Sequence, residues 1–318
     1  MRKKELNIRA PRTVEKKPFW VRFKKEAVFH IMIWFGVAFL IVFAYIPMSG
    51  IIIAFKDYNF RSGIFGSPWV GLKHFRQLFQ DFFMGNAVIN TVGISVLSIG
   101  LSYPCTIIFT LLLNELRNVK FKRVIQTVSY LPHFISWAIM AVILNSMLSP
   151  SEGIINIVLQ NLGFIDKPIA FLGREDLYWI TVVVASIWKS LGWNTIVYLA
   201  VISGIDESLY EAAKIDGAGR FARMRYITLP ALSGIIAIML ILSVGGIAGT
   251  GFDTSFYLSN DLNYNRSNTL SYYVYTIGLR RANFSYSTAI SFLLSVVSAT
   301  LMLTANTISN KLTGKGLF

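Results

Sequence analysis

Residues Leu232–Phe252 read LSGIIAIMLILSVGGIAGTGF and contain no charged side chain. A helix needs roughly 20 mainly apolar residues to cross the hydrocarbon layer of a bilayer, so this run predicts a transmembrane helix. Five more long apolar runs occur: Val28–Phe55, Ala87–Leu113, Val124–Leu148, Tyr178–Ile202 and Ser287–Ser309. Such continuous runs do not fit the short alternating strands of a β-barrel. The expected fold class is therefore an all-α membrane protein with six transmembrane helices.

The composition of the whole chain agrees with this class. Of its 318 residues 54% are hydrophobic, and the mean hydropathy of +0.56 exceeds what a soluble domain needs. The first apolar run lacks a convincing small-residue cleavage site, so it is expected to be retained as a helix. We expect a basic, amphipathic N-terminal segment at 1–26, a membrane domain at 27–309 with a loop at 203–230, and a tail at 310–318.

Positive charge is distributed unevenly along the chain. The net charge is +14, and twenty of the thirty Lys and Arg residues lie in the segments 1–26, 115–123, 203–229 and 310–318. The three loops expected on the other side, 56–86, 149–176 and 253–284, hold nine. Because cytoplasmic loops carry the excess of Lys and Arg, both termini and the 203–230 loop are predicted to be cytoplasmic. The basic excess thus sets orientation, and no nucleic-acid partner is expected.

Several prolines and glycines interrupt the apolar runs. Pro47, Pro104 and Pro132 predict kinks, since proline removes a backbone donor. The fifth run ends in the glycine-rich stretch Gly245–Gly251. Small residues there allow close packing of helices. An unwound stretch beside a substrate path is the alternative.

A polar island separates the fourth and fifth runs. Residues 211–230 read EAAKIDGAGRFARMRYITLP. Asp206 can cap a short helix over Glu207–Asp216, and Gly217 can end it in a left-handed conformation. Pro230 can then start the fifth transmembrane helix, where a missing N–H matters little. The island predicts a helix–turn–helix that a groove on another protein could hold; a plain surface loop is the alternative.

The spacing of Glu211-Ala212-Ala213, Gly217 and Ile227-x-Leu229-Pro230 resembles the EAA motif of ATP-binding-cassette (ABC) importer permeases. Further stretches agree in their order: Asn90-Thr91, Tyr130–His133, Trp188–Asn194, Tyr275–Leu279 and Ala305-Asn306. Together they resemble the maltose-type inner-membrane permease family with its type I importer fold. The similarity is closest to the branch for complex oligosaccharides and polysaccharide fragments, which includes the first permease of the alginate importer.

The resemblance implies a non-enzymatic subunit of a heteromeric importer. Its expected partners are a second permease, an ATP-binding-cassette ATPase dimer, an extracytoplasmic sugar-binding protein, an oligosaccharide and membrane lipid. No Gly-x-x-x-x-Gly-Lys-Ser/Thr occurs in the sequence, so ATP and Mg²⁺ are expected on the ATPase and no cofactor on this chain. The resemblance to the EAA motif implies that the residues that couple this chain to the ATPase are Glu211, Ala212, Ala213, Asp216, Gly217 and Pro230.

Lys189 is a charge in the middle of the fourth apolar run. A charge at membrane depth is costly, so it is expected to face the bundle interior or water. It can mark a substrate path, where aromatic rings stack on sugars and an ammonium favours an acidic unit such as a uronate. Equally, it can be a packing lysine that bonds carbonyls or pairs with a neighbouring permease. The candidate path residues are Trp188, Lys189, Trp193, Asn194, Phe252 and Asp253.

An ion-coupled secondary transporter and a membrane-embedded enzyme are the two alternative functional classes. An ion-coupled secondary transporter of sugars often has carboxylates at membrane depth and repeated halves, and the six runs have no convincing central Asp or Glu. The sequence contains none of the usual catalytic motifs of a membrane-embedded enzyme. His30, His74 and His133 are scattered without ligand spacing, so no metal site is expected.

Overall fold

The computed structural model describes residues 23, 26–314 and 316–317, and the predicted basic segment 1–26 lies almost wholly outside them. The described residues form helices and no strand; one isolated antiparallel bridge joins Lys56 and Trp69. The predicted all-α class is confirmed. Five helices are long and apolar enough to cross a membrane, and a bent pair makes up to a sixth. The chain divides into two compact units, Met1–Ile52 and Ile53–Phe318.

The described part of the first unit, from Glu26 onward, forms an apolar helix. It consists of α2 (Ala27–Leu40), a π-helical turn η1 (Ile41–Tyr45) and α3 (Ile46–Met48). Pro47 is the second residue after the π turn, where the widened helix accommodates the missing backbone donor. With the 3₁₀-helix η2 (Ser49–Phe55) the candidate span is Ala27–Phe55, close to the predicted first run.

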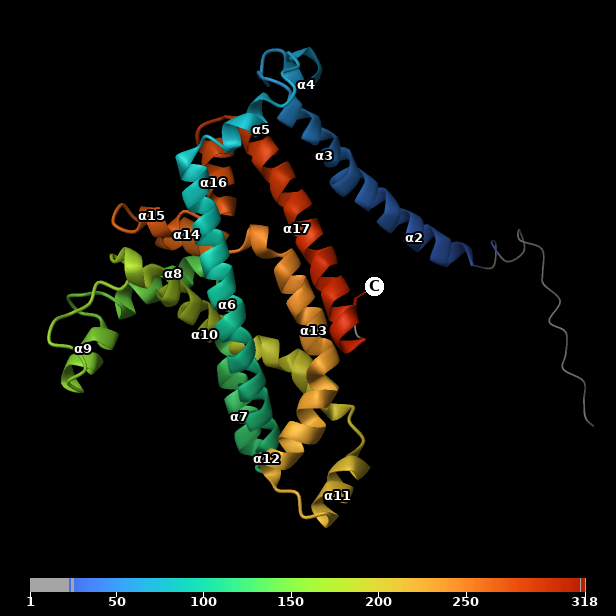
Figure 1. Ribbon diagram of the computed structural model, residues 1–318, viewed down its shortest axis with the longest axis vertical. Coiled ribbons are helices and arrows are strands. Elements are labelled where there is room, and N and C mark those ends of the chain that lie inside the picture. The colour runs from blue at the N-terminus through green and yellow to red at the C-terminus, as the bar shows by residue number, and fades with distance from the viewer. Residues whose placement is uncertain (1–22, 24–25, 315, 318) are drawn as a thin grey trace, which may run out of the picture. The chain divides into compact units, whose positions relative to one another are not determined.

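The second unit contains the remaining helices, shown in Figure 1. In chain order they are α4 (Gly63–Gly66), α5 (Lys73–Leu78), α6 (Phe82–Glu115), α7 (Val119–Tyr130), η3 (Leu131–Phe134), α8 (Trp137–Met147), α9 (Ile154–Asn161), α10 (Glu175–Ser203), α11 (Glu207–Ile215), α12 (Arg220–Arg223), η4 (Met224–Thr228), α13 (Leu229–Gly245), η5 (Ile247–Gly249), α14 (Phe252–Leu258), α15 (Tyr264–Ser267), α16 (Leu270–Tyr275), η6 (Thr276–Arg280) and α17 (Phe284–Thr313). The short helices α11 and α12 lie at one end of α6, and α4 and α5 lie at the other (Figure 1).

Asp81 ties the start of α6 to α16 and α17. Its carboxylate accepts hydrogen bonds from the backbone N–H groups of Phe83 and Met84, and from the hydroxyls of Tyr273 at 2.5 Å and Tyr286 at 2.7 Å. Burial acts to raise the pKa of Asp81, but these hydrogen bonds outweigh it and hold the pKa below its usual value. The ionised carboxylate therefore serves as helix cap and cross-link together.

The predicted third span is present as two helices rather than one. The segment Val119–Phe134 and helix α8 are bent by 104°. Pro132 is the second residue of the 3₁₀ turn η3, Ile135 is extended, and the Ser136 hydroxyl caps α8 by accepting the N–H of Ile139. Proline and a fresh cap together explain the break. By contrast, Pro104 lies inside α6, which stays helical from Phe82 to Glu115.

The fifth span begins and ends earlier than predicted. Helical structure runs continuously from Arg220 through the π turn η4 into α13, so Pro230 lies within this helix and the span is Arg220–Gly245. The chain leaves the α-helical path after Gly245. A Cβ at Gly245 would lie 3.2 Å from the Met302 side chain, so the helices pack closely at this point. Six residues later, Gly251 adopts a φ of +79°. The glycine stretch therefore both packs closely and unwinds.

A buried core and a hydrogen bond hold α8, α10 and α14 of the second unit together. A core of buried side chains joins α8 and α10, with Met140, Tyr178 and Val182 at its centre. The Tyr178 hydroxyl donates to the carbonyl of Thr254, which joins α10 to α14. These contacts place the glycine stretch and α14 beside α10.

Candidate functional site

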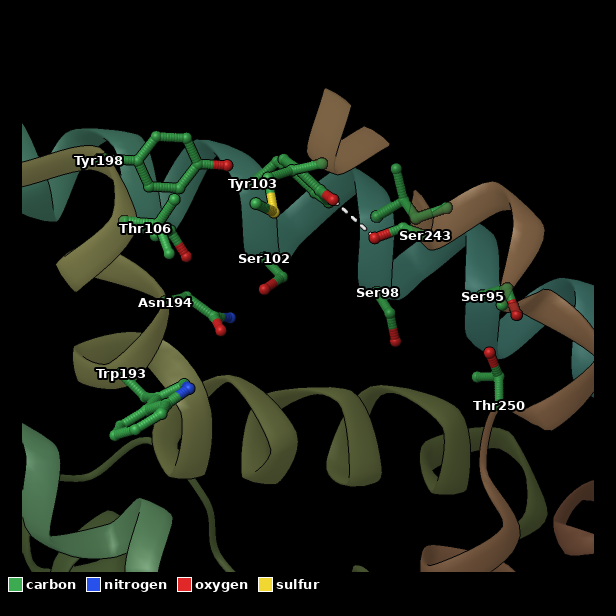
Figure 2. A pocket seen from close by; sticks show the side chains of 14 residues that line it. Ser95, Ser98, Ser102, Tyr103, Thr106, Trp193, Asn194, Tyr198, Ser243 and Thr250 are labelled. Atoms are coloured by element: carbon green, nitrogen blue, oxygen red, sulfur yellow. Dashed lines mark hydrogen bonds between the residues drawn. The ribbon is translucent and has the colours of Figure 1, made fainter. Parts of the chain in front are cut away.

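A cavity of about 520 Å³ lies between α6, α10 and α13. Figure 2 shows its lining, to which each of the three helices contributes polar side chains. The lining residues are Ser95, Ser98, Ile99, Ser102, Tyr103, Thr106, Trp193, Asn194, Val197, Tyr198, Met239, Ser243, Gly246 and Thr250. None of these described residues carries a charge.

One face of α6 supplies a row of hydroxyls. Ser95, Ser98, Ser102 and Thr106 are spaced by three or four residues, so they lie on the same side of the helix. The Ser95 side chain is 2% exposed and its hydroxyl has no hydrogen-bond partner. A buried hydroxyl without a partner is costly.

The opposite wall is formed by α10. Trp193 and Asn194 line the cavity, and in Figure 2 the Asn194 amide lies between α10 and the hydroxyls of Ser98 and Ser102. The Trp193 ring stacks on the His133 ring of η3, with centroids 4.4 Å apart and planes 1° from parallel. An aromatic ring held beside amide and hydroxyl groups is suited to stacking and hydrogen bonding with a polyhydroxyl molecule.

A single side-chain hydrogen bond joins α6 to α13 at this cavity. The hydroxyls of Tyr103 and Ser243 lie 2.6 Å apart, as Figure 2 marks. Gly246 and Thr250 continue the lining where α13 has ended. The unwound glycine stretch thus borders the cavity.

Phe252 and Asp253 line a second, smaller cavity of about 140 Å³. Ser98 and Thr250 belong to both linings, so the two cavities are neighbours. The structure therefore brings four of the predicted path residues to adjoining spaces: Trp193 and Asn194 to the larger, Phe252 and Asp253 to the smaller.

Trp188 and Lys189 are placed elsewhere. Trp188 is 44% exposed and lines an apolar groove formed by α8, α9, α10 and Phe171. The Lys189 ammonium donates to three backbone carbonyls at the break of the third span, and the side chain is only 8% exposed. These are the contacts of a packing lysine.

The 203–230 loop, called the coupling loop below, has the local structure expected from its sequence. The Asp206 carboxylate accepts the N–H of Ser208 at 3.0 Å, and this bond lowers the pKa of Asp206. At the other end of α11, the N–H of Ala218 bonds the carbonyl of Ala213 and the N–H of Gly217 bonds that of Lys214. This pair of bonds is a Schellman motif, with Gly217 at φ +79°. The predicted cap and left-handed end are confirmed.

The coupling loop exposes apolar as well as charged side chains. Glu211 and Ala212 are exposed and Ala213 is half-buried, while Ile215 and Phe221 are 87% and 84% exposed. Exposed apolar side chains beside polar ones are typical of a surface that another protein covers.

Two contacts connect the coupling loop to the helices of the cavity. The Tyr210 hydroxyl lies 2.9 Å from that of Thr228, which is buried in η4 directly before α13. Arg220 pairs with Glu115 at the end of α6, with 3.9 Å between the charged atoms. Movement of the loop can therefore reach both α13 and α6.

Sequence reasoning missed the hydroxyl row and its partners: Ser95, Ser98, Ser102, Tyr103, Thr106 and Ser243. The signal was present as polar residues at helical spacing within an apolar span. Hydroxyls are common in transmembrane helices, where they bond the preceding turn, so spacing alone does not show that they face a cavity.

A helical bundle with membrane-crossing helices, a polar interior cavity and an exposed loop linked to its walls defines a transport component of a membrane. Residues 102–313 match the family model described as binding-protein-dependent transport system inner membrane component. The chain belongs to this family. It is a permease subunit and not an enzyme, as predicted, and as an inner membrane component it is a multi-pass protein of the bacterial inner membrane.

Close relatives extend this identification. The chain is 38% identical over 306 residues to the polygalacturonan/rhamnogalacturonan transport system permease protein YteP of Bacillus subtilis, covering 96% of this chain and 94% of YteP. It is also 38% identical to protein LplB of the same organism, over 93% of this chain and 92% of LplB.

A solved structure shares the fold. The crystal structure of a bacterial alginate ABC transporter, in complex with an alginate pentasaccharide-bound periplasmic protein, contains a chain that matches with a TM-score of 0.85 and 33% identity. The match covers 94% of this chain and 99% of that one. The predicted type I permease fold and the resemblance to the alginate importer's permease are confirmed, and nothing in these similarities supports the ion-coupled alternative.

Proposed function

We propose that this chain forms one half of the translocation path of an ATP-driven importer for oligosaccharides or polysaccharide fragments. The observation that carries the proposal is the 520 Å³ cavity, which hydroxyl and amide groups line together with Trp193. Such a lining offers donors and acceptors to sugar hydroxyls and a flat ring to a sugar face. The names of the relatives, which refer to polygalacturonan, rhamnogalacturonan and alginate, support a complex and acidic saccharide.

A second, similar permease would complete the path. The cavity has walls from α6, α10 and α13, and it opens to the surface of this chain. An open, polar cavity cannot face lipid without leaving its hydroxyls unpaired. A partner permease that closes the cavity within the bilayer removes this problem and gives a heterodimeric pore.

The coupling loop is proposed to bind the ATPase. The rigid Schellman end of α11 presents Glu211, Ala212 and Ala213 together, and the exposed Ile215 and Phe221 offer apolar contact area. Asp216 and Gly217 form the turn, and Pro230 lies in the helix that leads to the cavity. ATP and Mg²⁺ bind to the ATPase, whose closure moves the loop and so alternates access to the cavity. A binding protein delivers the saccharide from outside.

The proposed orientation places both termini and the coupling loop in the cytoplasm. It is supported by the excess of Lys and Arg in the segments on that side. The end of the second unit that bears α4 and α5 then faces the binding protein (Figure 1).

Uptake by the complete importer in proteoliposomes tests the saccharide path. Ser98→Leu fills the cavity, and we expect it to stop uptake of galacturonate oligosaccharides while the complex still assembles. The control is Ser295→Leu, because Ser295 is exposed on α17 and does not line the cavity. Equal uptake by the two variants would contradict the proposed path.

ATPase coupling is tested separately with Glu211→Lys. We expect normal insertion, loss of uptake and loss of the ATPase stimulation that loaded binding protein causes, because a reversed charge disrupts the docked surface. Normal uptake in this variant would count against the proposed role of the loop.

A further inference from the structure

The break in the third span leaves backbone carbonyls that need donors. In a continuous helix the carbonyl of His133 would accept the N–H of Trp137, four residues later. Here Ile135 is extended with ψ 130°, and the chain turns by 104° before α8 starts. Unpaired carbonyls at membrane depth are costly, so such a break needs compensation from a neighbour.

Lys189 of α10 provides it. Its ammonium donates to the carbonyls of Ile135 at 2.5 Å and His133 at 2.8 Å, and at 3.3 Å to that of Pro132, which also accepts the N–H of Ile135. An ammonium has three N–H donors, so these contacts occupy all of them. Within the described part of the chain, Lys189 forms no ion pair within 4 Å, although Asp253 is near enough to interact with it electrostatically.

The next turn of α10 completes the contact with the break. At Gly192 a Cβ would lie 2.2 Å from the Ser129 carbonyl oxygen, so the backbones of α10 and α7 touch and only glycine fits. Trp193, four residues after Lys189 and on the same face, stacks on His133 and meets Phe134 edge-on at 5.9 Å. One face of α10 thus contacts both sides of η3.

We propose that Lys189 is a positioning residue, which supplies the donors missing at the broken helix and thereby holds the His133–Trp193 stack in the wall of the cavity. This inference rests on the proposed saccharide path, since Trp193 matters for transport only if saccharide passes it. Because the ammonium is committed to carbonyls, it does not pair with a saccharide carboxylate. Lys189 affects acidic and neutral saccharides alike, through Trp193.

The test uses the whole importer with trigalacturonate and its fully methyl-esterified form, which have the same backbone and differ in charge. We expect Lys189→Met to reduce the maximal uptake rate of both by about tenfold, the effect of leaving buried carbonyls without donors, with the ratio of the two rates unchanged. Lys189→Arg, which retains the donors, is expected to restore most of the uptake. Lys167→Met makes the same change at an exposed lysine and serves as control.

A spectroscopic readout follows Trp193 directly. The complex is labelled with 5-fluorotryptophan, and the Trp193 resonance is identified by its loss in Trp193→Phe. We expect this fluorine resonance to move in Lys189→Met and to stay in place in Lys189→Arg and Lys167→Met. If Lys189→Met does not assemble, Lys189→Gln replaces it, because the amide keeps N–H donors without the charge. A native resonance and an unchanged acid-to-ester ratio in this variant support the proposal, and a fall confined to trigalacturonate contradicts it.

Two results would overturn it. The first is a loss of uptake confined to trigalacturonate, because that would show a direct charge contact. The second is an unmoved Trp193 resonance in Lys189→Met. If the native importer carries neither saccharide, the proposed substrate class fails, while the fluorine resonance still decides whether Lys189 positions Trp193.

Discussion

Gly217 gives the sharpest test of the coupling loop, because its backbone conformation can be changed without a steric clash. Its φ is +79°, and no heavy atom lies within 4 Å of where a Cβ would be. The left-handed conformation costs an L-residue about 1–2 kcal/mol, and reduced freedom of the unfolded chain returns about 0.4–1 kcal/mol. Gly217→Ala is therefore expected to weaken the end of α11 by about 1 kcal/mol, roughly a fivefold fall in the capped population.

Gly217→Pro should have a much larger effect. Proline removes the N–H that bonds the Lys214 carbonyl at 3.1 Å and requires a φ near −65°. It also disfavours the helical backbone of Asp216, whose ψ is 3°. Together these changes cost about 3 kcal/mol or more, so the Schellman end cannot form. The Gly204→Ala variant is the control, because Gly204 has a φ of −91° and a Cβ there meets only ordinary contact at 3.5 Å.

The assay measures saccharide uptake and ATPase stimulation by loaded binding protein in proteoliposomes, with membrane insertion checked separately. We expect near-native coupling in the Gly204→Ala control, reduced coupling in Gly217→Ala and no coupling in Gly217→Pro. A Gly217→Pro importer that inserts and transports normally would refute the idea that a rigid end of α11 transmits ATPase closure.

Three further predictions concern the helices around the cavity. Because its pKa is lowered on folding, Asp81 contributes stability that is fully present above its unfolded pKa of about 3.9 and is lost as the pH falls through its lower folded pKa; the melting temperatures of wild type and Asp81→Asn should therefore differ at pH 7, and the difference should shrink as the pH falls below about 4. Gly192→Ala should lower the unfolding free energy by about 1–3 kcal/mol, since its Cβ would overlap Ser129; an unchanged denaturation midpoint would disagree. A double-mutant cycle with Tyr103→Phe and Ser243→Ala should give a coupling of about 0.5–1.5 kcal/mol in detergent stability, whereas additive effects would mean that the hydrogen bond contributes nothing.

Features that depend on neighbouring residues in the chain were predicted well. The Asp206 cap and the left-handed Gly217 follow from residue types at short spacing, and both are present. The first, second, fourth and sixth apolar runs agree with single long helices, whereas the third is broken and the fifth is shifted toward the N-terminus. Errors arose where competing local signals met: Pro230 was expected to start a helix, but the π turn at Met224–Thr228 accommodates it inside one.

The sequence by itself determined the class of protein, the presence of several long apolar spans and the capped helix of the coupling loop, because hydropathy and capping are properties of contiguous residues. Only the tertiary structure decided which polar groups meet. The hydroxyls of Ser95, Ser98 and Ser102 line one cavity with Trp193 because α6 packs beside α10, and the Lys189 ammonium bonds carbonyls because the third span turns by 104° next to it. The direction of a side chain inside a membrane depends on the neighbour that packs against it, and a single chain's sequence does not contain that information locally.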